Sequence, residues 1–82
     1  MSDSAENLLI TKEVDARGLN CPLPILKAKK ALNDLQSGQV IKVVSTDSGS
    51  KRDFEAFARQ TGNPLIRLEE IDNVWTFYLQ RR

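Results

Sequence analysis

The alternation of hydrophobic and polar residues changes its period several times along this chain of 82 residues. Strict alternation is typical of strands, whereas hydrophobic residues three or four positions apart are typical of helices. On this basis the chain predicts the element order β-α-β-α-β-β, punctuated by glycine, proline and asparagine. The predicted strands are residues 10–16, 39–46, 65–70 and 74–80, and the predicted helices are residues 22–35 and 50–61.

Both predicted helices place their hydrophobic residues on one face. These residues are Ile25, Ala28, Leu32 and Leu35 in the first helix, and Phe54, Phe57 and Ala58, with Thr61, in the second. A strand-helix-strand crossover is right-handed, which assigns its helix to a defined face of the sheet. We therefore expect an α+β fold, a two-layer α/β sandwich in which both helices cover one face of a four-stranded mixed sheet.

Two details of the predicted strands can be checked directly. Ile66 and Leu68 alternate with polar residues, which predicts that both point to the same face of their strand. Asp72 and Asn73 separate the last two strands, and this pair is typical of a tight hairpin turn. At the start of the second helix, Ser50 lies three residues before Asp53, a spacing that resembles a capping box.

The amino-acid composition limits the kinds of catalytic site that this chain can form. The formal net charge is +1, and the chain has one cysteine and no histidine. The single thiol excludes an internal disulfide, which fits a reducing compartment, and the lack of histidine excludes catalytic Ser-His-Asp and Cys-His arrangements. We expect no metal site and no cofactor. The first residues, Met1 to Asn7, are polar and acidic and unlike a signal peptide. We therefore predict a disordered tail at 1–8 and one cytoplasmic domain at 9–82, with no membrane span.

Cys21 lies between a glycine-containing loop at residues 17–20 and two prolines, Pro22 and Pro24. Proline fits the first helical turn, where its missing N–H has no helical partner. Cys21 is therefore predicted at or next to a helix N-terminus, whose partial positive charge favours a thiolate. We expect the pKa of this thiol to lie below the ordinary value of about 8.5. The alternative is a buried cysteine that packs as a small hydrophobic residue.

The surroundings of Cys21 resemble a known family. Asp15, Gly18, Leu19, Cys21, Pro22 and Pro24 look like the signature of the TusA/SirA-like sulfur-carrier family, built around a Cys-Pro-x-Pro motif. Residues 47–54 resemble its second segment, an acidic turn before a helix, although proline is common in the family where this chain has Ser48. The resemblance extends from about Lys12 to the C-terminus and implies the β-α-β-α-β-β fold.

The same resemblance implies a function. Cys21 would accept sulfane sulfur from a cysteine desulfurase or a rhodanese and pass it to a downstream sulfur-acceptor protein. The family's routes lead to thiolated tRNA, molybdenum cofactor or sulfur oxidation. On this interpretation the chain is a covalent carrier of the sulfurtransferase type rather than a stand-alone enzyme, and we expect a monomer.

Charged residues near the motif have candidate roles of their own. We expect Asp15 to orient the cysteine loop by accepting main-chain N–H groups, and Arg17, Lys27 and Arg52 to contact a partner or add positive potential at Cys21. Asp53 is interpreted as a helix cap or a partner contact. Lys29, Lys30 and Lys51 could extend these cations into a basic patch.

A second hypothesis belongs to another functional class. The β-α-β-α-β-β order with a basic helix face also resembles the C-terminal domain of a translation initiation factor. The chain would then be a non-catalytic RNA- or protein-binding module, and Cys21 would be incidental. The near balance of acidic and basic residues favours the carrier, since RNA-binding domains are usually more basic.

Overall fold

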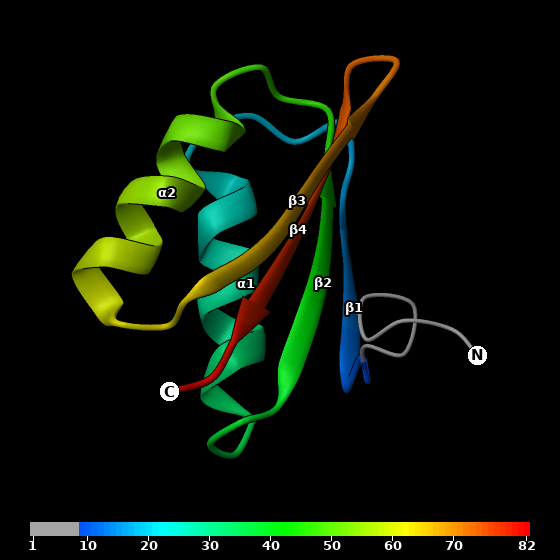
Figure 1. Cartoon of the computed structure of the whole chain (residues 1–82). Helices are drawn as coiled ribbons and strands as arrows, with labels where there is room; N and C mark the ends of the chain where they lie inside the picture. The colour runs from blue at the N-terminus through cyan, green and yellow to red at the C-terminus, as the bar shows by residue number, and fades with distance from the viewer. Residues whose placement is uncertain (1–8) are drawn as a thin grey trace.

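The computed structural model describes residues 9–82, and it consists of a sheet with both helices on one face (Figure 1). The predicted order β-α-β-α-β-β is confirmed. The strands lie in the order β1-β2-β4-β3, with β1 parallel to β2 and the other pairs antiparallel, so the sheet is mixed as predicted. The elements are β1 Lys12–Ala16, α1 Leu23–Asn33, β2 Val40–Ser45, α2 Ser50–Thr61, β3 Leu65–Ile71 and β4 Val74–Gln80.

The hydrophobic core lies between the helices and the sheet. Ala28 and Leu32 of α1 are buried there, as are Phe54 and Phe57 of α2, which confirms the helix faces predicted from their spacing. The ring of Phe54 stacks on that of Phe77 in β4, with centroids 4.3 Å apart, and meets Phe57 edge to face. Because buried aromatic rings pack in preferred orientations, these contacts fix how α2 is rotated against the sheet.

The strand β3 departs from regular alternation. Ile66 and Leu68 were predicted to share a face, but Ile66 is exposed while Leu65 and Leu68 pack against the core. The pairing of β3 with β4 shifts register between Leu65 and Arg67. An irregularity of this kind adds a residue to one strand and changes the side to which the next side chains point. The prediction for Ile66 was therefore wrong because of a local shift in register.

The turn between β3 and β4 was predicted correctly, whereas both ends of α1 differ from the predicted bounds. Residues 72–73 both have positive φ, 53° and 64°, as a tight hairpin turn requires. Pro22 is the N-cap of α1, so the helix begins at Leu23, one residue later than predicted, and it ends at Asn33 rather than at Leu35. The tail predicted at residues 1–8 lies outside the described residues. Within residues 9–82, no helix is long and apolar enough to cross a membrane.

Two connecting loops meet at one end of the molecule. Residues 17–22 leave β1 and residues 46–49 leave β2, and these strands are parallel neighbours. The carboxyl ends of parallel neighbours lie at the same edge of a sheet, so the loops lie side by side, at the top of Figure 1. This arrangement brings the Cys-Pro-x-Pro segment against the turn that begins α2.

Candidate functional site

Cys21 lies on the surface, in the loop between β1 and α1. Its side chain is exposed, so the buried alternative is wrong. The N–H of Cys21 donates a hydrogen bond to Oδ2 of Asp47 at 3.2 Å, and the Cys21–Pro22 peptide bond is cis. Pro24 is buried beneath the loop in the first turn of α1. The thiol is thus presented to solvent from a loop that is attached to the neighbouring turn.

The carboxylates of Asp53 and Asp47 both affect the pKa of the Cys21 thiol. The interaction with Asp53, in the first turn of α2, is the main cause that raises the pKa of the Cys21 thiol above its ordinary value. Partial desolvation and the negative charges of Asp53 and Asp47 act in the same direction. The prediction of a lowered pKa was therefore wrong. These effects all favour the protonated thiol over the thiolate.

The prediction of a lowered pKa assumed that main-chain N–H groups at the start of α1 are free to stabilise a thiolate. The N–H of Leu23, the first residue of α1, donates to the carbonyl of Asn20 at 2.8 Å. The N–H of Leu26 bonds to the carbonyl of Pro22, and the prolines have no N–H to offer. The first N–H group of α1 is therefore bonded to the preceding loop, and the carboxylates of Asp53 and Asp47 raise the pKa of Cys21.

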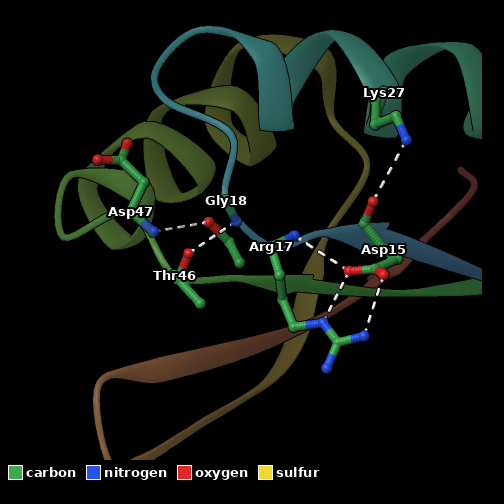
Figure 2. A network of polar contacts seen from close by, with 7 residues as sticks. Asp15, Arg17, Gly18, Lys27, Thr46 and Asp47 are labelled. Atoms are coloured by element: carbon green, nitrogen blue, oxygen red, sulfur yellow. Dashed lines mark hydrogen bonds and ion pairs between the residues drawn. The ribbon is translucent and has the colours of Figure 1, made fainter.

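Asp15 organises the start of the loop. Figure 2 shows the Arg17 guanidinium against the Asp15 carboxylate, with bonds of 2.9 Å from Nε and 3.1 Å from a terminal nitrogen. The Arg17 N–H also donates to this carboxylate, as the loop-orienting role requires. The side-chain bond from Arg17, followed by its main-chain bond, lowers the pKa of Asp15 to about 2. Lys27 of α1 donates to the Asp15 carbonyl at 3.3 Å.

This network separates the predicted cations from the thiol. Arg17 and Lys27 were expected to add positive potential at Cys21, but both are bonded to Asp15. Arg52 is exposed on the first turn of α2. The groups that shift the pKa of Cys21 are acidic, so the expected positive potential at Cys21 is not what the structure shows.

Gly18 connects the two loops. Its φ of 79° lies in the left-handed region, where side chains are strained, and its N–H donates to Oγ1 of Thr46 at 2.9 Å (Figure 2). A Cβ at Gly18 would meet nothing within 4 Å, so glycine is required there by the backbone and not by space. The main chain of Cys21 is bonded in turn to Asp47.

The turn that carries Asp47 is held by two buried hydroxyl groups. Oγ of Ser45 and Oγ of Ser50 lie 2.6 Å apart, and Ser45 Oγ accepts the N–H of Asp47. The predicted capping box is therefore wrong: the N-cap of α2 is Gly49, with no side-chain cap bond, and Ser50 faces inward. Ser45, Thr46 and Asp47 were not predicted as site residues, and only the family-like segment 47–54 gave a signal for them.

Comparison with known proteins identifies the family. The family model described as "Sulfurtransferase TusA" matches residues 12–81. The chain belongs to the TusA family. It is 54% identical over 70 residues to the sulfur carrier protein TusA of Allochromatium vinosum, covering 85% of this chain and 92% of that protein. It is 50% identical over 72 residues to a putative sulfur carrier protein of Neisseria meningitidis, covering 88% and 97% of the two chains.

A solved structure supports the same assignment. The SirA-like protein of Desulfitobacterium hafniense superposes with a TM-score of 0.76 and 29% identity, covering 85% of this chain and 96% of that one. The resemblance inferred from the Cys-Pro-x-Pro segment is confirmed. Since the relatives are named as sulfur carriers, the comparisons give no support to the RNA-binding alternative.

The TusA motif of this chain is bordered by exposed hydrophobic side chains. Leu23 and Leu26 lie in the first turns of α1 and are 46% and 52% exposed. A cavity of about 240 Å³ lies between β1 and α1, lined by residues that include Lys12, Lys27 and Lys30, and Cys21 does not line it. The thiol thus lies on an open, partly apolar surface suited to contact with another protein.

Proposed function

We propose that Cys21 is the residue on which this sulfur carrier holds its cargo, as a persulfide. The observation that carries the proposal is the exposed position of the chain's single thiol, within the Cys-Pro-x-Pro segment of a TusA family member. Exposure is required because both the donor and the acceptor of the sulfur atom must reach the same side chain.

The transfer is an exchange in which the Cys21 sulfur, as its thiolate, reacts with a persulfide. The Cys21 sulfur attacks the outer sulfur of a persulfide on the donor, a new S–S bond forms, and the donor's S–S bond breaks. The proton of the Cys21 thiol ends on the donor's sulfur, so no net oxidation occurs. In the second transfer an acceptor thiol attacks the outer sulfur, and Cys21 returns to its starting form.

The partners follow from this chemistry. The donor is a cysteine desulfurase or a rhodanese, because both form persulfides, and the acceptor is a downstream sulfur-acceptor protein. A pathway that ends in tRNA thiolation would involve RNA only indirectly. We infer that residues 9–82 act as one monomeric domain in the cytoplasm. The exposed Leu23 and Leu26, adjacent to the motif, provide the apolar contact for the partner protein.

The test is direct sulfur loading. The protein is incubated with a cysteine desulfurase and cysteine, and intact-protein mass spectrometry measures the addition of sulfur. We expect sulfur on the wild type, and none on Cys21→Ser, which replaces the exposed thiol with a hydroxyl of similar size. Sulfur addition to Cys21→Ser, or none to the wild type with several donors, would refute the proposal.

The docking surface is tested separately. Leu26→Ala is compared with Ile66→Ala, since Ile66 is also exposed but lies on β3, away from the motif. We expect the first variant to slow loading by the desulfurase and the second to load at the wild-type rate. Equal rates for the two variants would remove Leu26 from the docking surface, without affecting the assignment of Cys21.

A further inference from the structure

The N–H of Cys21 takes its acceptor from outside its own loop. The N–H of Leu23 donates to the carbonyl of Asn20 at 2.8 Å and closes a four-residue turn around Cys21. Such a turn uses the carbonyl and the N–H at its two ends, so the N–H of its second residue stays unpaired within the turn. Oδ2 of Asp47 accepts this N–H at 3.2 Å. Cys21 is therefore attached by its own main chain to the loop that follows β2.

Asp47 is itself fixed by the pair of buried serines. Its N–H donates to Oγ of Ser45 at 3.2 Å, and its carbonyl accepts the N–H of Ser50 at 3.0 Å. The two serine hydroxyl oxygens are 2.6 Å apart and buried. Asp47 is half-buried, whereas Cys21 is exposed. A carboxylate held in this way on a fixed turn is preorganised, so it positions the exposed loop.

Within the described residues, the loop of Cys21 is bonded to the loop after β2 at two points. The N–H of Gly18 donates to Oγ1 of Thr46 at 2.9 Å near the start of the loop (Figure 2). The second point is the bond from Cys21 to Asp47. Beyond Cys21, Pro24 is buried in the first turn of α1. The bond to Asp47 thus lies between two fixed ends, and its loss would release the residue that carries the thiol.

The orientation of the thiol matters because sulfur exchange is directional. The attacking sulfur approaches in line with the S–S bond that breaks, and a docked donor cannot turn to meet a misplaced thiol. Holding two reacting groups in the right geometry contributes a large part of the rate of such a reaction. The Cys21 N–H lies at the surface and could bond to water instead, so the bond to Asp47 adds little to stability. Its main effect is on the direction in which the thiol is presented.

We propose that Asp47 is a positioning residue for sulfur transfer, which holds the main chain of Cys21 so that a docked donor meets the thiol in one orientation. The inference rests on the proposed persulfide at Cys21 and adds the residue that fixes its geometry. Asp53 and partial desolvation raise the pKa of the Cys21 thiol, and the charge of Asp47 adds to them. The bond and the charge of Asp47 therefore act in opposite directions, and substitution can separate them.

Two variants of equal net charge isolate the bond. Asp47→Asn removes the charge and keeps an acceptor oxygen, whereas Asp47→Ala removes both. Each is mixed with an excess of a cysteine desulfurase preloaded with cysteine, and intact-protein mass spectrometry follows the loading rate against donor concentration. We expect Asp47→Ala to load roughly three- to tenfold more slowly than Asp47→Asn at saturating donor. The half-saturating donor concentration should be the same for both, because the docking surface is unchanged.

The matched control is Ser48→Ala. Ser48 is exposed in the same turn, and its side chain makes no hydrogen bond within residues 9–82. This variant should load at the wild-type rate. Loading as slow as that of Asp47→Ala would show an effect of any change in the turn and would overturn the specific role of Asp47.

Alkylation by iodoacetamide separates positioning from a change in the thiol itself. A small reagent in solution can approach an exposed thiol from any side, so its rate reports the pKa of the thiol and not its orientation. Asp47→Asn and Asp47→Ala both lack the charge, and they should be alkylated equally fast at each pH. Urea unfolding followed by Trp75 fluorescence checks that both are folded. If Asp47→Ala is not, Asp47→Leu replaces it, since leucine has the branching of asparagine and no acceptor.

The outcomes distinguish the two proposals. Equal saturating rates for Asp47→Asn and Asp47→Ala would overturn the role of Asp47 and leave Cys21 as the carrier residue. A variant Asp47→Ala that is slower in both loading and alkylation would show a less reactive thiol and would also overturn the positioning role. No loading of the wild type by any donor would count against the proposed persulfide itself.

Discussion

The pair of buried hydroxyl groups beneath the site allows a quantitative test of how the Asp47 turn is held. Ser45 and Ser50 have relative exposures of 0% and 1%, and their oxygens are 2.6 Å apart. In Ser50→Ala the buried Ser45 hydroxyl still accepts the Asp47 N–H, but its own O–H loses its partner. A buried polar group left unsatisfied costs about 1–3 kcal/mol. In a domain of this size, each kcal/mol lowers Tm by about 4–8 °C.

The assay is urea unfolding followed by Trp75 fluorescence, since Trp75 is buried on β4 and paired directly with Ser45. Ser45→Ala should destabilise at least as much as Ser50→Ala, because Ser45 also accepts the Asp47 N–H. The double variant should lose less than the sum of the two, as expected for groups in contact. The control is the exposed Ser37→Ala, expected within about 0.5 kcal/mol of the wild type. A Ser50→Ala protein as stable as Ser37→Ala would refute the reasoning.

Three further predictions concern the fold. Arg17 lowers the pKa of Asp15 from 3.8 to about 2. The ionised carboxylate therefore stabilises the folded state above pH 3.8, and this contribution is lost as the pH falls toward 2. Urea unfolding at several pH values should show this loss in the wild type and not in Asp15→Asn. Asn73→Val should lower the free energy of unfolding by about 1–2 kcal/mol, because φ is 64°, whereas Asn73→Gly should not. Gly62→Ala, at φ 78° with little room for a Cβ, should lower Tm, and an unchanged Tm would contradict the assigned strain.

The fold was predictable because its signals are local. The helical spacing of Phe54 and Phe57 and the turn residues 72–73 each act over a few positions, and each defined an element that the structure confirms. The register shift in β3 was not predictable, because Ile66 and Leu68 alternate as a regular strand would. Only the pairing with β4 shows that the shift turns Ile66 outward.

The site was predictable only in part. Cys21 and its exposure followed from the prolines, which mark a helix start. Its electrostatics did not follow, because Asp47 and Asp53 are 26 and 32 residues further along the chain, and only the parallel pairing of β1 with β2 brings them to the thiol. Ser50 was misassigned for a similar reason, since a serine at a helix start is usually a cap and its burial depends on Ser45.

The raised pKa of Cys21 is consistent with the function of a carrier. A cysteine that starts a reaction on its own substrate benefits from a thiolate, and enzymes lower its pKa to obtain one. A carrier reacts with its donor only once the two proteins have docked. Until then an exposed thiolate would be open to alkylation and oxidation, because the thiolate is the more reactive form of a cysteine. Asp53 and Asp47 raise the pKa of the Cys21 thiol, which favours its protonated form. The raised pKa therefore protects the empty carrier from alkylation and oxidation until it has docked with its donor.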